Sequence, residues 1–272
     1  MKPLMKQFYV IGNPISHSKS PIIHQNFAEQ TGIALSYEQY FSEIPDFEST
    51  IDRFVKTGVA GVNVTLPFKE RAFALCNEVS IRAKLSRAVN TLSFIDGKIF
   101  GDNTDGAGLV SDFSFNQVSL LNKKILIIGA GGATRGAIPA LLDADPTSIT
   151  IVNRTFEKAQ LILDELEHER LFAEHINKLS DQYDVIINAT SSSVTNELPA
   201  IEPWVFNSAA CVYDLFYKQE PTRFLRWALE QNPKLVVIDG LGMLIEQAAE
   251  AFYVWHKQRP DTSEIRKLLK LS

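Results

Sequence analysis

The stretch KKILIIGAGGATRGAIPALLDA, residues 123–144, decides how the second half of the chain folds. It opens with a continuous apolar run, which is typical of a strand buried in a parallel sheet, and this run leads directly into glycines. A helix is predicted over the remainder, 133–144. Glycines at such a turn let backbone N–H groups approach a pyrophosphate at the helix N-terminus, so the stretch predicts a dinucleotide site.

The glycine loop departs from the usual G-x-G-x-x-G pattern. Gly129 and Gly131 occupy the first two glycine positions, but Thr134 holds the third, and Gly136 follows two residues later. A tight turn that binds nothing is the alternative interpretation. The strand before the loop and the helix after it favour the nucleotide site.

Strands and helices alternate along the whole chain, which indicates an α/β protein with a doubly wound, Rossmann-like sheet in its second half. Predicted strands cover 7–12, 35–41, 60–67, a hairpin turning at Asp96-Gly97, 123–128, 148–154, 183–190, 210–217 and 234–240. Predicted helices cover 22–32, 46–58, 133–144, 155–169, 222–231, 241–256 and a short terminal segment within 259–271.

Composition narrows the class of protein. The chain has 272 residues, of which 45% are hydrophobic and 22% charged, so disordered and low-complexity proteins are excluded and two domains are expected. A net charge of −5 gives no general attraction to nucleic acid or anionic lipid. The two cysteines and five histidines show no metal-binding spacing, so no metal is predicted. No apolar run is long enough to span a membrane, and we expect a cytoplasmic protein.

The end of the second strand of this sheet predicts which dinucleotide binds. NAD enzymes place an acidic residue there to bind the ribose 2′-OH, whereas a carboxylate would repel the 2′-phosphate of NADP. Here the strand ends Asn153-Arg154-Thr155, and Lys158 follows one turn later. The guanidinium fork of Arg154 suits a phosphate, so NADP is the predicted cofactor.

Four polar segments follow consecutive predicted strands in the first half of the chain: SHSKSP (16–21), NVTLPFK (63–69), AVNT (88–91) and GDNTDG (101–106). Each alone is explained by capping or turn chemistry, and we interpret Ser20 and Asp102 in that way. Because ligands bind outside the carboxyl ends of strands in such sheets, the four together predict a substrate site.

These segments, with GAGGATRG, NRT, NAT and GLGML..QAA, occur in an order that resembles the shikimate dehydrogenase family from residue 10 to about 256. The resemblance implies reversible NADPH-dependent reduction of 3-dehydroshikimate to shikimate. It also implies a substrate-binding and catalytic domain of residues 1–107 plus 241–272, and an NADP-binding domain of residues 108–240.

The matching motifs imply a role for each site residue. Lys69 and Asp105 resemble the family's catalytic pair. Substrate-binding residues by the same match are Ser16, Ser18, Thr65, Lys69, Asn90, Asp105, Tyr217 and Gln247. Cofactor-binding residues are Gly129, Ala130, Gly131, Gly132, Ala133, Asn153, Arg154, Thr155, Lys158, Thr190, Leu215 and Gly240. The partner is therefore a small molecule, with no nucleic acid or membrane, and the protein is expected to be a monomer or a homodimer.

Elementary chemistry supports the lysine assignment. Hydride reduction of a ketone builds negative charge on oxygen, and a protonated lysine can donate to it while Asp105 keeps the lysine oriented. In the oxidative direction a lysine must instead accept a proton, so oxidation is expected to improve at alkaline pH. One departure concerns the loop after Thr190, where the family commonly has a glycine and this chain has Ser191, Ser192 and Ser193. Serine would be costly there if the backbone needed a positive φ.

Two other functions remain as alternatives. A quinate/shikimate dehydrogenase that uses NAD is one, although the Asn-Arg-Thr end of the second strand argues against it. A non-catalytic relative that only binds NADP or shikimate is the other, and the presence of both Lys69 and Asp105 argues against that.

Overall fold

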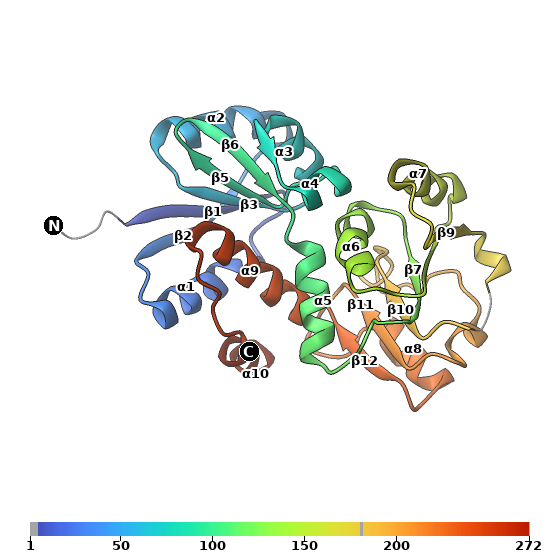
Figure 1. The fold of residues 1–272 in the computed structure, drawn as a ribbon. Helices are drawn as coiled ribbons and strands as arrows, with labels where there is room; N and C mark the ends of the chain where they lie inside the picture. The colour runs from blue at the N-terminus through green and yellow to red at the C-terminus, as the bar shows by residue number, and fades with distance from the viewer. Residues whose placement is uncertain (1–4, 180–181, 272) are drawn as a thin grey trace. The chain divides into compact units, whose positions relative to one another are not determined.

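The computed structural model describes residues 5–179 and 182–271 (Figure 1). The chain divides into two compact units, one built from residues up to Gly108 together with those from Ile245 onward, the other from Leu109–Leu244. It leaves the first unit within helix α5 (Asp105–Phe115) and returns to it within helix α9 (Leu241–His256).

The first unit contains a mixed six-stranded sheet of order β2-β1-β3-β5-β6-β4. Strand β1 is parallel to β2 and β3, whereas β5 is antiparallel to β3 and β6. The β5–β6 hairpin turns at Asp96 and Gly97, both with positive φ, as a two-residue turn with the twist of its strands requires. The strands are β1 (Lys6–Gly12), β2 (Leu35–Phe41), β3 (Gly61–Val64), β4 (Glu78–Val79), β5 (Thr91–Ile95) and β6 (Lys98–Asp102).

Two helices of this unit end where the chain supplies a glycine. Helices α1 (Ser20–Thr31) and α2 (Phe47–Thr57) stop at Gly32 and Gly58, which adopt the left-handed conformation of a C-cap. The others are α3 (Lys69–Leu75), α4 (Ile81–Ser86), α10 (Ser263–Leu271) and the 3₁₀ turn η1 (Ile44–Asp46). Sequence analysis did not predict α3, α4 or β4, which are too short to show a hydrophobic period.

The second unit is a doubly wound sheet, which confirms the predicted fold class. Its six strands are all parallel, in the order β12-β11-β10-β7-β8-β9. The strands are β7 (Lys124–Ile128), β8 (Ser148–Val152), β9 (Leu171–Glu174), β10 (Val185–Asn188), β11 (Cys211–Asp214) and β12 (Val236–Asp239). The helices are α6 (Gly132–Asp143), α7 (Phe156–Leu166) and α8 (Arg223–Gln231), with 3₁₀ turns η2 (Ile176–Lys178) and η3 (Pro203–Phe206).

Buried apolar side chains lie on both faces of this parallel sheet. Ile125 and Ile127 of β7 pack into one core, and Leu126 and Ile128 of the same strand pack into the other. A strand buried on both faces is apolar at every position, which is why 125–128 is an unbroken run. Within residues 5–179 and 182–271, no helix combines the length and the apolar character needed to cross a membrane.

Candidate functional site

The first group of candidate site residues meets at the start of two helices in the first unit. Lys69 opens α3 and Asp105 opens α5, and the lysine Nζ lies 2.5 Å from the Asp105 Oδ2. Asn90 donates from its Nδ2 to the other carboxylate oxygen at 2.7 Å. The Asp105 side chain is almost fully buried while that of Lys69 is 23% exposed. The pair is therefore fixed on its aspartate side and accessible on its lysine side.

Asn90 is the centre of this group. Its Oδ1 accepts bonds from the Thr104 backbone N–H at 2.9 Å and from the Thr91 hydroxyl at 2.8 Å. Its Nδ2 also lies 3.3 Å from the Oε1 of Gln247. These bonds fix which end of the amide faces Asp105, so the structure brings Lys69, Asp105, Asn90 and Gln247 together.

Gln247 reaches this group because a glycine lies opposite it. A Cβ at Gly108 in α5 would lie 2.6 Å from the backbone nitrogen of Gln247 in α9. Only glycine allows the two helices to approach so closely here. Sequence analysis missed Gly108, because it predicted no helix over Asp105–Phe115.

A buried chain of polar side chains supports Asn90 from behind. The Tyr37 hydroxyl donates to the Asn63 Oδ1 at 2.7 Å, and the Asn63 Nδ2 donates to the Thr91 hydroxyl and to the Asn90 carbonyl, both at 3.1 Å. Sequence analysis did not assign roles to Tyr37 or Asn63. The signal for Asn63 was its place in NVT on a strand that is otherwise buried.

Ser16, Ser18 and Thr65 lie on loops that follow the adjacent strands β1 and β3. The Asn13 N–H donates to the Leu66 carbonyl at 3.0 Å, which ties the two loops together. Ser18 Oγ accepts the Ser20 N–H at 3.3 Å. The Ser16 hydroxyl is exposed and bonds none of the residues in the described ranges, so it is available to a ligand.

Ser20 and Asp102 were interpreted as capping or turn residues. Helix α1 begins at Ser20 with Lys19 at the cap position and no side-chain cap bond, so Ser20 is not a cap, but its N–H closes a turn with the Ser18 hydroxyl. Asp102 accepts the Asn103 N–H at 2.7 Å and receives two bonds from Arg82. Burial opposes ionisation of Asp102, but the bonds and charge of Arg82 outweigh it and lower the pKa of this carboxyl.

The second group of residues lines a cavity of about 460 Å³ in the second unit. It lies at the carboxyl ends of β7, β8 and β10, where doubly wound sheets bind ligands. The predicted residues that line it are Gly129, Ala130, Gly131, Asn153, Arg154, Thr155, Lys158 and Thr190.

The glycine loop is shaped for close approach of a ligand. Gly129 has a φ of 110°, and a Cβ there would lie 2.9 Å from the Ala189 carbonyl oxygen. A Cβ at Gly131 or Gly132 would meet only open space, so the start of α6 is uncovered. Thr134, at the third glycine position, is buried and its hydroxyl donates to the Gly129 carbonyl at 2.7 Å. This bond explains how the loop tolerates a threonine in that position.

The cavity has two features that favour a phosphate. Arg154 and Lys158 are exposed on its wall, and neither forms an ion pair within residues 5–179 and 182–271. Helix α7 begins beside them with Thr155 as N-cap, and no side chain caps it. Uncapped N–H groups and two cations without a carboxylate partner favour an anion.

Asn153 has a second role besides lining the cavity, and several predicted cofactor residues lie outside the lining that the structure describes. Asn153 braces the loop, since it accepts the Ala130 N–H at 3.3 Å and donates to the Thr155 carbonyl at 2.8 Å. Ala133 lies in the first turn of α6. Leu215 and Gly240 are not among the described residues that line the cavity, and a Cβ at Gly240 would lie 2.0 Å from the Leu215 carbonyl oxygen.

Tyr217 follows β11 in the second unit and is half-buried. Burial, and then the charge of Asp239, raise the pKa of its hydroxyl above the ordinary value. The phenol is therefore neutral at physiological pH and is a hydrogen-bond donor.

The serines after Thr190 do not strain the backbone. Among the described residues of this loop, the one non-glycine residue with positive φ is Asn196, so Ser191, Ser192 and Ser193 all adopt ordinary conformations. Ser193 is buried, and its hydroxyl donates to Asp214 at 2.6 Å. The departure from glycine therefore has no backbone cost here.

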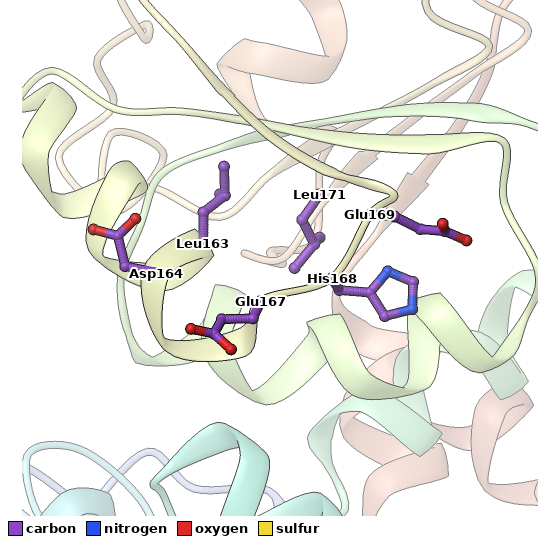
Figure 2. A pocket seen from close by; sticks show the side chains of 6 residues that line it. All are labelled: Leu163, Asp164, Glu167, His168, Glu169 and Leu171. Carbon is purple, nitrogen blue, oxygen red and sulfur yellow. The ribbon is translucent and has the colours of Figure 1, made fainter.

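A second hollow in this unit, shown in Figure 2, does not suit an anionic ligand. It is lined by Leu163, Asp164, Glu167, His168, Glu169 and Leu171. Its three carboxylates would repel a phosphate. No three His, Cys, Asp or Glu side chains in the described part of the chain gather in a metal-binding arrangement. We therefore place the candidate ligand site at the glycine loop.

Three family models match separate parts of the chain. The family model for the shikimate dehydrogenase substrate binding domain matches residues 10–92. The model for shikimate / quinate 5-dehydrogenase matches residues 113–197, and the model for the shikimate 5'-dehydrogenase C-terminal domain matches residues 240–270.

Individual relatives match over nearly their full length. A curated shikimate dehydrogenase (NADP(+)) from Hydrogenovibrio crunogenus is 45% identical, over 97% of this chain and 98% of the relative. The crystal structure of an Ael1 enzyme from Pseudomonas putida is 43% identical with a TM-score of 0.94, covering 98% of this chain and 99% of that one. Shikimate 5-dehydrogenase from Thermus thermophilus, solved with NADP(H) and shikimate, is 32% identical with a TM-score of 0.88, covering 97% and 98%.

Proposed function

This chain belongs to the shikimate dehydrogenase family, and from that premise we propose that it catalyses the reversible NADPH-dependent reduction of 3-dehydroshikimate to shikimate. The observation that carries the proposal is the Lys69–Asp105 pair, with 2.5 Å between Nζ and Oδ2. A non-catalytic binding protein has no need of a partly exposed ammonium held by a buried carboxylate. The reaction belongs to the synthesis of aromatic amino acids.

NADPH, when bound, supplies the hydride, and the chain supplies the proton. As the ketone carbon is reduced, charge builds on its oxygen, and the Lys69 ammonium donates a proton from Nζ to that oxygen. Asp105 holds the ammonium in place because both of its oxygens are engaged, one by Lys69 and the other by Asn90. In the reverse direction the Lys69 amine accepts the proton from the substrate hydroxyl.

The remaining substrate contacts follow from the polar groups at the strand ends. We assign the substrate carboxylate to the hydroxyls of Ser16 and Ser18. The ring hydroxyls are assigned to Thr65, Asn90, Asp105 and Gln247, and Tyr217 of the second unit completes the set. Residues 1–107 plus 241–272 then form the substrate domain, and 108–240 the NADP domain.

NADP is the cofactor, and its recognition rests on the unpaired cations of the second unit. The glycine loop and the start of α6 bind the pyrophosphate. Arg154 and Lys158, with the N-terminus of α7, bind the 2′-phosphate. The two thiols of the chain, Cys76 and Cys211, are free, which suits a reducing cytoplasm, where we expect the enzyme to act as a monomer or homodimer.

A matrix of activities tests this function against the alternative that uses quinate and NAD. Oxidation of shikimate and of quinate is measured with NADP and with NAD. We expect shikimate with NADP to give the highest kcat/KM, because Arg154 stands just after the end of β8, where NAD enzymes place the acidic residue that binds the ribose 2′-hydroxyl. Comparable turnover of quinate with NAD would identify the alternative enzyme, and no turnover of either substrate would refute the proposal.

Oxidation of shikimate is expected to accelerate as pH rises above neutrality, whereas reduction of 3-dehydroshikimate is not. The reason is that oxidation of the substrate hydroxyl releases a proton, which a general base must accept, whereas reduction of the ketone consumes one. Initial rates in both directions, measured from about pH 6 to about pH 10, check this for a lysine acid/base. If Lys69→Ala, at its lower rates, kept the wild-type rise of shikimate oxidation with pH, Lys69 would be removed from the proton transfer.

A further inference from the structure

Asp214 is a buried carboxylate that the proposed reaction does not use. It ends strand β11, has no exposed surface, and accepts four hydrogen bonds. The hydroxyls of Ser193 and Thr222 donate to its Oδ2, each at 2.6 Å. The Asn188 side chain and the Phe216 N–H donate to its Oδ1, each at 3.2 Å. A charged group is costly to bury unless it is paired or fully hydrogen-bonded, and the four hydrogen bonds offset that cost for Asp214.

The four donors come from different segments of the second unit. Asn188 ends β10 and Ser193 lies in the loop that follows it, whereas Phe216 is the second residue and Thr222 the last residue of the loop after β11. Asp214 therefore ties two loops to one point. The first loop carries Thr190, and the second begins with Leu215 and includes Tyr217.

The bonds extend from Asp214 to Thr190 through Asn188. Asn188 donates to both Asp214 and Ser193, at 3.2 Å each, which leaves its Oδ1 facing the other way. That oxygen accepts the Thr190 hydroxyl at 2.7 Å and the Thr190 N–H at 3.2 Å. If the Ser193 hydroxyl is removed, Asn188 loses an acceptor and Asp214 loses a donor, so the amide that orients Thr190 is held less firmly.

We propose that Asp214 and Ser193 are positioning residues of the proposed dehydrogenase, which act through Asn188 to hold Thr190 at the wall of the cofactor cavity and through Phe216 to hold the neighbouring Tyr217 for the substrate. The inference rests on the proposed function. Neither residue touches the phosphate-binding groups, Arg154 and Lys158. Their loss should therefore slow catalysis more than it weakens NADP binding.

Ser193→Ala and Ser193→Gly test the proposal, with Ser193→Thr as the variant that keeps the hydroxyl. Ser208→Ala is the matched control, because Ser208 is an exposed serine of the same unit and no role is assigned to it. For each protein kcat and KM are measured in both directions. NADP affinity is measured by fluorescence titration, and the unfolding midpoint by calorimetry.

We expect Ser193→Ala and Ser193→Gly to lower kcat by about tenfold, the cost of leaving one buried carboxylate oxygen short of a donor, while NADP affinity changes by less than about twofold. Ser193→Thr should exceed both in kcat, and Ser208→Ala should match the wild type. An unchanged kcat in the alanine and glycine variants, even with a lower unfolding midpoint, would show a purely structural bond and overturn the inference.

A double variant that combines Ser193→Ala with Asp214→Asn tests whether the two residues affect kcat together or independently. If Ser193 acts through Asp214, the double variant should lose no more kcat than Asp214→Asn alone. Full additivity would contradict the inference, and the single serine variants decide it if Asp214→Asn fails to fold. An inactive wild type in the activity matrix would refute the proposed function, whereas an active wild type with unaffected Ser193 variants would refute this inference alone.

Discussion

Replacing Lys69 by alanine is expected to lower kcat by about 10²–10⁴-fold, the usual contribution of a general acid or base, in both directions. The ammonium is the one cation that the structure places against Asp105 among the described residues of the first unit. Without it, charge on the ketone oxygen has no acid beside it. Shikimate affinity should fall little, since the carboxylate and the other ring hydroxyls have their own donors, and equilibrium titration of shikimate measures this directly.

Two further variants show whether a loss of activity in Lys69→Ala comes from the missing charge at this position. Lys69→Met keeps most of the apolar stem and removes only the charge, so it should be as inactive as Lys69→Ala if folding is intact. Lys56→Ala is the control, because Lys56 forms an exposed pair with Asp52 on α2, and loss of such a pair costs little. A Lys69 variant that turns over at the wild-type rate would disprove the acid/base assignment.

The parts of the fold that could be predicted are those where pattern and burial coincide. Strand β2 and helix α9 have the predicted bounds, 35–41 and 241–256, because each is bordered by clear breaks in the pattern. Helix α7 was predicted to reach residue 169 but ends at Leu166, since Glu167 takes a left-handed conformation without being glycine. That early end leaves room for β9, which the sequence did not reveal.

The residues of the site could be predicted, but the hydrogen bonds between them could not. The motifs named Lys69, Asp105, Asn90 and Gln247, yet nothing in their spacing says that Asn90 bonds the carboxylate. That bond depends on how β5 and α5 are packed, which is a tertiary property. The same holds for Ser193, which looked like a strained substitution for glycine and is instead a donor to a carboxylate twenty-one residues later.

Replacing Arg154 by alanine is expected to weaken NADP binding by about 1.5–3 kcal/mol, the contribution of a charged hydrogen bond, with NAD binding unchanged. That is a loss of roughly tenfold to 150-fold in affinity. The guanidinium is exposed at the cavity and forms no ion pair in the described ranges, so a 2′-phosphate does not have to compete with a carboxylate for it. Calorimetric titration of NADP and NAD against each protein measures both values.

Alanine variants of the neighbouring cation Lys158 and of the distant cation Lys234 are compared with Arg154→Ala. Lys158→Ala should show a smaller loss for NADP, because a lysine offers one point charge where Arg154 offers a planar fork. Lys234→Ala is the control, since Lys234 is an exposed cation of the same unit outside the cavity lining. If Arg154→Ala kept its full preference for NADP, the 2′-phosphate would have to bind elsewhere. If the affinities for NAD and NADP fell equally in Arg154→Ala, Arg154 would bind a part that is common to both cofactors. Lys158 and the start of α7 would then be the groups that distinguish NADP from NAD.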